Sequence, residues 1–173
     1  MAPLKMKGDR AELEVARDLI RRGYRIAFPY GEDWDFDLIF SRPDSHQLER
    51  VQVKYTRSDR EVILVRASSN SLTNGKVRRV KHYTAKSIDW LAVYDATTDR
   101  CYYGPAWELG DKGMSHLTLR LTSPKNGQML RIRYANDYLD PTPPHQGGLP
   151  VAAVEPAGLE PAPFALPARR SPN

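Results

Sequence analysis

The order of secondary-structure patterns in the first 139 residues constrains the fold most: one long amphipathic helix precedes a series of short strands. Apolar residues in 9–23 (DRAELEVARDLIRRG) recur with helical spacing over about four turns, and Gly23 marks the C-terminal end. Strand patterns bounded by turn residues follow in 24–29, 36–40, 49–56, 61–66, 88–95, 100–105 and 116–121. These patterns predict an α/β domain with a central mixed sheet flanked by helices.

The segments between the strands are expected to be loops and short helices. The polar residues of 68–79 predict a loop, and 80–87 (VKHYTAKS) predicts a short helix. A single helical turn is expected at 106–109, and a short helix at the end of 124–139.

The composition changes abruptly at Asp140. Residues 140–173 contain nine of the fourteen prolines and have neither a helical nor a strand period. Proline without periodicity is typical of a disordered or extended segment. We therefore predict one domain over residues 1–139 and a disordered tail over residues 140–173.

Charge and cysteine content restrict the environment and the partners. The formal net charge is +5, and residues 1–139 alone carry +6, because the tail holds more acidic than basic residues. An excess of positive charge on the domain favours a polyanionic partner. The single cysteine, Cys101, allows no intramolecular disulfide, and no segment is apolar enough to cross a bilayer. We expect a soluble, cytoplasmic protein with no membrane partner.

The first helix places one of its two neighbouring glutamates on the apolar face. On a helical wheel, Glu12 lies near the centre of the face formed by leucine, valine, isoleucine and alanine side chains. Glu14 lies almost opposite, beside Arg10 and Arg17, where a solvated ion pair explains it. A carboxylate that faces the core needs a partner, a proton or a metal. A buried arginine or lysine would satisfy Glu12 as well as a metal would.

Two strand patterns place polar side chains among apolar ones. Alternation in 36–40 (FDLIF) puts Asp37 on the face opposite to the phenylalanines, and in 51–56 (VQVKYT) Gln52 and Lys54 share one face. Taken alone, these strands would also fit a half-buried sheet with a polar outer face. Together with Glu12 they match metal-assisted phosphodiester cleavage, in which oxygen ligands hold a hard divalent cation and a lysine assists the attacking water.

The stretches KGDRAE, FDLIF and VQVK resemble the PD-(D/E)XK nuclease superfamily. More narrowly, the chain is similar to the branch that contains archaeal-type Holliday junction resolvases and an intron-encoded homing endonuclease with a Gln-x-Lys motif. The later stretches IDWLAVYD, CYYGP and LTLRL are similar to the same branch, so that the resemblance covers about residues 7–139. It implies a restriction-endonuclease-like core.

The resemblance also implies roles for individual residues. Glu12, Asp37 and Gln52 would be catalytic metal ligands, joined by the backbone carbonyl of Val53, and Lys54 would position or activate the hydrolytic water. Most of the superfamily has an acid where this chain has Gln52, which keeps an oxygen ligand but removes one negative charge. The expected cofactor is Mg²⁺, with Mn²⁺ as a substitute.

Basic residues after the second site strand are candidates for contacts with DNA. As a set near a carboxylate site, they suit phosphate binding, although each alone also fits a solvated loop. The set is Arg57, Arg60, Lys76, Arg78, Arg79 and Lys81. Tyr102, Tyr103 and Trp107 could stack on bases, but a core or interface position is preferred. DNA, duplex or branched, is the expected partner of a homodimer or higher homo-oligomer.

The sequence therefore predicts a Mg²⁺-dependent endodeoxyribonuclease that hydrolyses phosphodiester bonds. Two alternatives stay open. The first is a four-way (Holliday) junction resolvase with the same fold and chemistry. The second is a catalytically inactive DNA-binding module, with Gln52 as the sign of a lost active site.

Overall fold

The computed structural model describes residues 4–31, 34–73, 76–123 and 132–142, without the side chains of Leu4, 71–73 and 76–79. One helix, α1 (Leu4–Arg21), and nine strands make up most of this part of the chain. The strands are β1 (Arg25–Ala27), β2 (Leu38–Ser41), β3 (Leu48–Thr56), β4 (Val62–Arg66), β5 (Ser68–Thr73), β6 (Lys76–His82), β7 (Trp90–Asp95), β8 (Arg100–Pro105) and β9 (His116–Arg120). Two short 3₁₀ helices, η1 (Ala106–Leu109) and η2 (Ala135–Tyr138), complete it.

Five strands form the central sheet in the order β1-β2-β3-β7-β8. The pair β3–β7 is parallel and the other three pairs are antiparallel, which confirms the predicted mixed sheet. The register pairs Gln52 with Leu91 and Lys54 with Val93. Because paired residues share a face of a sheet, Gln52 and Lys54 lie on the face of Leu91 and Val93.

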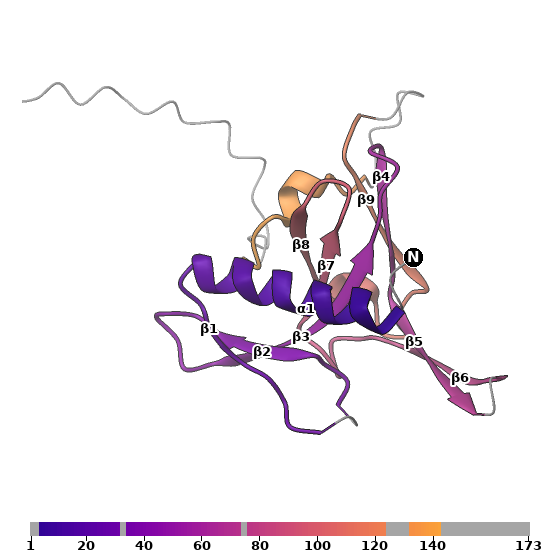
Figure 1. Ribbon diagram of the computed structural model, residues 1–173, viewed down its shortest axis with the longest axis horizontal. Coiled ribbons are helices and arrows are strands. Elements are labelled where there is room, and N and C mark those ends of the chain that lie inside the picture. The colour runs from indigo at the N-terminus through magenta and orange to yellow at the C-terminus, as the bar shows by residue number, and fades with distance from the viewer. Residues whose placement is uncertain (1–3, 32–33, 74–75, 124–131, 143–173) are drawn as a thin grey trace, which may run out of the picture. The chain divides into compact units, whose positions relative to one another are not determined.

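Helix α1 covers one face of this sheet, as Figure 1 shows. Its buried residues Ala11, Val15, Ala16 and Leu19 pack with alternate residues of the sheet strands, among them Trp90, Ala92 and Tyr94. The helix ends at Arg21, and Gly23, with a φ of 84°, terminates it as predicted. The Gly23 amide donates to Ile20 and the Tyr24 amide donates to Leu19, which is the Schellman pattern of helix termination. The helix begins at Leu4, earlier than the predicted start at Asp9.

A second core cluster covers the other face of the sheet. Leu91 and Val93 of β7 pack there with residues of β4, β9 and the two 3₁₀ helices. Strand β7 is thus buried on both faces, which explains why 90–94 (WLAVY) is a continuous apolar run and does not alternate. The sequence predicted helices on both faces of the sheet. In the described part of the chain an α-helix covers one face, and β4 and β9 contribute much of the cover on the second.

Two predictions about the segments between the expected strands were wrong. Residues 68–73 and 76–79, expected to belong to a loop, form the antiparallel hairpin strands β5 and β6, which point away from the central sheet (Figure 1). Residues 80–87, expected to be helical, complete β6 and then form a turn. Strands β4 and β9 pair with each other and do not extend the central sheet.

The hairpin was missed because its strands lack the apolar alternation that usually marks a half-buried strand. A better signal is Asn74-Gly75, a dipeptide that favours two-residue hairpin turns. Thr73 and Lys76, on either side of it, are paired in the register of β5 and β6.

Residues just beyond the predicted domain boundary at residue 139 still contact the domain. Asp140 accepts hydrogen bonds from Arg22 and Tyr24, and the Pro141 carbonyl accepts one from Arg42 at 2.5 Å. The predicted disordered tail lies outside the described residues from 143 onward. No helix in the described part of the chain is long and apolar enough to span a membrane.

Candidate active site

The candidate site lies where β2 begins beside the middle of β3. The Asp37 amide still pairs with the Val51 carbonyl at 2.9 Å, and two residues further along β3 the Val53 amide has no strand partner on this side among the described residues. The Asp37 carboxylate takes that place, since its Oδ2 accepts the Val53 N–H at 2.7 Å. An acidic residue at the start of an apolar strand is thus held by the backbone of the neighbouring strand.

The same geometry leaves the Val53 carbonyl beside Asp37. In an antiparallel pair, the N–H and C=O of one residue point towards the same neighbour, so the Val53 carbonyl points to the position that β2 does not fill. Gln52 Nε2 donates to Asp37 Oδ2 and lies 3.4 Å from the Val53 oxygen. Asp37, Gln52 and Val53, which sequence reasoning proposed as ligands, are therefore in direct contact.

Lys54 extends from the second face of the sheet to a buried tyrosine. Its Nζ donates to the Tyr83 hydroxyl at 3.0 Å and lies 4.9 Å from the centre of the Tyr83 ring. Sequence reasoning missed Tyr83 as a site residue. No local pattern relates residues 54 and 83, because their contact depends on where β6 ends relative to β3.

Glu12 lies at the margin of the buried helix face and not at its centre. The wheel counted Leu13 and Ile20 among the apolar residues around it, but these side chains are 66% and 56% exposed. Without them the buried face narrows and shifts towards Val15 and Leu19, which leaves Glu12 half-buried. Glu14 pairs with Arg17 at 2.8 Å, but its side chain is only 21% exposed, so the prediction of a solvated residue on the opposite helix face was wrong.

Electrostatic interactions connect Glu12 to the other site residues. Burial raises the pKa of the Glu12 carboxyl, Asp37 and Asp9 raise it further, and Lys54 lowers it. Burial also raises the pKa of Asp37, against the opposing effects of the Val53 N–H and Lys54. Asp37 and Lys54 are thus close enough to Glu12 to influence the ionisation of its carboxyl. A bound cation would stabilise both ionised carboxylates.

The donor set fits a hard divalent cation. Two carboxylates, one amide and one backbone carbonyl supply only oxygen ligands, the type that Mg²⁺ prefers. Within the described residues, no group of three or more His, Cys, Asp and Glu side chains is placed to hold a metal. Since the Gln52 nitrogen faces Asp37, its amide must turn by half a rotation to present oxygen to a cation.

The candidate DNA contacts fall into three groups. Arg57 and Arg60 are exposed in the connection between β3 and β4. Lys81 forms an ion pair with Asp35, two residues before Asp37, so this lysine already has an acidic partner. The side chains of Lys76, Arg78 and Arg79 lie outside the described residues, although their backbone belongs to β6.

The three aromatic residues considered for base stacking differ in exposure. Tyr102 and Tyr103 are buried in the two core clusters, in agreement with the preferred interpretation. Trp107 of η1 is instead 57% exposed.

Comparisons with known proteins agree with this fold. The chain matches the sequence profile of the PD-(D/E)XK endonuclease family over residues 3–141. It therefore belongs to this family of nucleases. None of the curated proteins compared with the chain matches it.

Among solved structures, the fold is similar to that of the bacterial homing endonuclease I-Ssp6803I. The TM-score is 0.59 at 19% sequence identity, and the match covers 79% of this chain and 88% of the other. At this identity the likeness confirms the restriction-endonuclease-like fold that the resemblance implied.

Proposed function

We propose that the protein is a divalent-metal-dependent DNA endonuclease. The observation that carries this proposal is the Asp37 carboxylate held against the Val53 amide, beside the Val53 carbonyl and within electrostatic reach of Glu12 and Lys54. Membership of the nuclease family supports the reaction class. The positive charge of the chain supports a polyanionic substrate.

In this proposal Glu12, Asp37, Gln52 and the Val53 carbonyl hold the cation. When bound, Mg²⁺ would polarise the scissile phosphate and offset its charge. Lys54 orients the attacking water and stabilises the negative charge that develops on the phosphate. Gln52 contributes an oxygen without a charge, so the two carboxylates dominate the electrostatic attraction for the metal.

The basic residues of β6 and of the connection between β3 and β4 would bind the DNA backbone. Arg57 and Arg60 are exposed on the surface, where they could bind phosphates. Lys76, Arg78 and Arg79 belong to β6. Lys81 would contribute only if DNA displaces Asp35 from their ion pair. These contacts would position the substrate without reading its sequence.

The decisive test is cleavage of plasmid DNA in Mg²⁺ by wild type and by Lys54→Ala, with Lys112→Ala as a control at an exposed lysine. We expect Lys112→Ala to retain activity and Lys54→Ala to lose about 100-fold or more. Equal rates for wild type and Lys54→Ala would reject the role of Lys54.

Calorimetric titration separates an active nuclease from a DNA-binding module without activity. The proposal requires Mg²⁺ or Mn²⁺ to bind in the presence of uncleaved DNA. If neither ion binds and the DNA still does, the inactive module is the better description.

Oligomeric state and substrate structure belong to the same proposal. One site cuts one strand, so a double-strand break needs a second copy, and a homodimer supplies it by symmetry. Cleavage of a small panel of linear duplex, flap and four-way junction DNA would identify the substrate. Paired symmetric nicks in the junction alone would indicate a resolvase.

A further inference from the structure

We propose that Tyr83 is a positioning residue for Lys54, and that the end of β6 with the turn after it braces the active site. This inference rests on the proposed nuclease function. It adds a residue outside the three sequence stretches that carry the resemblance to nucleases.

The contact between Lys54 and Tyr83 fixes the end of a flexible side chain. The Tyr83 ring is 3% exposed and belongs to the second core cluster, so it cannot move without disturbing the core. Its hydroxyl accepts a hydrogen bond from Lys54 Nζ at 3.0 Å, and the centre of its ring lies 4.9 Å from the same atom. A lysine has four rotatable bonds, and a rigid acceptor restricts the positions that its ammonium group samples.

The backbone of Tyr83 is itself held on two sides. Its amide donates to the Ala67 carbonyl at 3.1 Å. A Cβ added to Gly113 would lie 2.7 Å from the Tyr83 carbonyl and 2.5 Å from the His82 Cβ, so only a glycine fits against this segment. The φ of Gly113 is 72°, which also favours glycine. Tyr83 thus sits between two neighbouring segments that leave it little room to shift.

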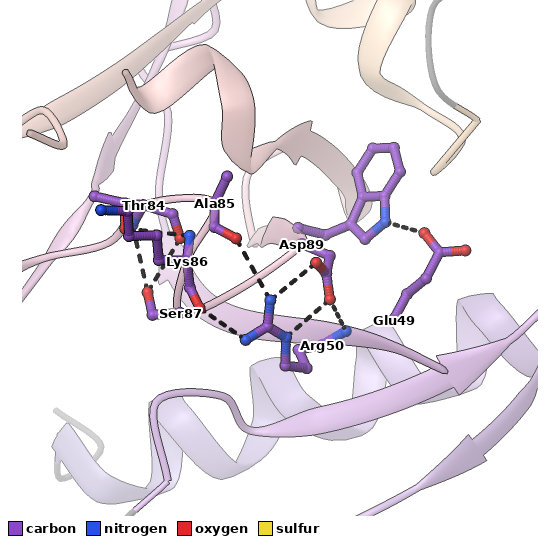
Figure 2. A network of polar contacts seen from close by, with 8 residues as sticks. Glu49, Arg50, Thr84, Ala85, Lys86, Ser87 and Asp89 are labelled. Atoms are coloured by element: carbon purple, nitrogen blue, oxygen red, sulfur yellow. Dashed lines mark hydrogen bonds and ion pairs between the residues drawn. The ribbon is translucent and has the colours of Figure 1, made fainter. Parts of the chain in front are cut away.

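Arg50 fastens the turn that follows Tyr83 to β3 (Figure 2). Its guanidinium makes two hydrogen bonds with Asp89, at 3.0 and 3.1 Å, and donates to the carbonyls of Lys86 and Ala85 at 2.9 and 3.5 Å. Arg50 lies on the strand that carries Lys54. Strand β3 therefore carries Lys54 and also holds the turn that follows Tyr83.

Lys81, which like Tyr83 lies near the end of β6, contacts the segment that leads to Asp37. Residues 81 and 83 are two apart, so in extended backbone they share one face. Lys81 pairs with Asp35 in the approach to Asp37, while Tyr83 contacts Lys54 on β3. The Lys81 pair is exposed and stabilises little, whereas the contact to Tyr83 is largely shielded from water.

The test compares Tyr83→Phe with Tyr138→Phe in the full chain. Tyr138 is a buried tyrosine of the same core cluster whose hydroxyl donates to Glu108, and phenylalanine preserves the ring in both variants. The measurements are the single-turnover cleavage rate in Mg²⁺, the dissociation constant for uncleaved DNA, and the ¹⁵Nζ signal of Lys54 in lysine-labelled protein.

We expect Tyr83→Phe to slow single-turnover cleavage by about 10- to 100-fold with an unchanged dissociation constant. The Lys54 signal should shift or broaden in Tyr83→Phe and stay as in wild type in Tyr138→Phe. Rates that fall equally in both variants would indicate a merely structural effect and overturn the proposal.

The spectroscopic measurement separates this inference from the proposed function. If wild type does not cleave DNA, the nuclease proposal fails, and the Lys54 signal still decides whether Tyr83 positions it. An unchanged Lys54 signal in Tyr83→Phe would overturn the inference whatever the activity. Arg50→Lys, which loses the paired contacts to Asp89, should change the Lys54 signal in the same direction but less.

Discussion

Asp37, beside β3, and Asp95, the last residue of β7, have environments that shift their carboxyl pKa in opposite directions. Asp95, at the end of β7, is fully buried and accepts hydrogen bonds from Ser58, Thr97 and Thr98 through both carboxylate oxygens. Burial raises its pKa, but these bonds more than compensate, and the net shift is downward. Asp37 has the opposite net shift, because burial outweighs the Val53 N–H and Lys54.

The comparison separates an acid that stabilises the fold from one available for chemistry. Asp95 links the start of the connection between β3 and β4 to the end of β7. Both of its carboxylate oxygens accept hydrogen bonds from other residues of the protein. Asp37 accepts its bonds through Oδ2. It also has Glu12 as a negative neighbour, which is the arrangement that a cation would stabilise.

The largest expected effect comes from Asp37→Asn. This change removes one of the two carboxylates of the proposed metal site and keeps the size of the side chain. We expect cleavage in Mg²⁺ to fall by about 100- to 1000-fold, with a change in the free energy of unfolding of less than about 1 kcal/mol. Single-turnover kinetics and urea denaturation measure the two effects. A variant that cleaves like wild type would remove Asp37 from the site.

Asp95→Asn should reduce the free energy of unfolding strongly, in contrast to the small change expected for Asp37→Asn. An amide presents an N–H₂ group to a position surrounded by donors, so at least one buried hydrogen bond becomes a conflict. We expect the free energy of unfolding to fall by about 2–4 kcal/mol in urea denaturation. Asp111→Asn, at an exposed turn, is the matched control and should change it by less than about 0.5 kcal/mol. Equal stability of Asp95→Asn and wild type would contradict the structural role.

The pH dependence of stability sharpens the contrast. The folded-state pKa of Asp95 is lowered, so its contribution is present above its unfolded-state pKa of about 3.9 and is lost as pH falls through the folded value. The stability gap between wild type and Asp95→Asn should thus be constant from pH 7 to 5 and narrow below about pH 4.

Asp37 should show the reverse sign, since its folded-state pKa is raised. Relative to Asp37→Asn, wild type without metal should gain stability as pH falls through the folded pKa of Asp37. Urea denaturation of each pair over a pH series measures both slopes. Slopes of equal sign would show that the two acids do not differ as described.

The smallest expected effect is that of Glu12→Gln in metal-free protein. The neutral amide removes the repulsion from Asp37 and Asp9 and reduces the cost of burial, so the melting temperature should rise slightly or stay constant. Calorimetric binding of Mn²⁺ should weaken in the same variant. A clear loss of thermal stability would indicate that Glu12 has a structural partner and is not held for a cation.

Local patterns in the sequence were enough for much of the framework. The helical period of α1, the stop at Gly23 and the apolar runs of β3, β7 and β8 depend on residues close in the chain, and the structure has these elements close to where they were expected. The β5–β6 hairpin and the exposure of Leu13 and Ile20 were not predicted, because pairing partners and packing neighbours decide them.

The sequence by itself determined which chemical groups are available: carboxylates at 12 and 37, an amide at 52 and an ammonium group at 54. It also determined that the last two share a strand face, since side chains alternate along any strand. Only the tertiary structure decided that β2 begins where the Val53 amide and carbonyl need a partner, and that Tyr83 meets Lys54 across 29 positions of sequence. Such contacts depend on how strands pair and how the core packs, and no short-range period encodes either.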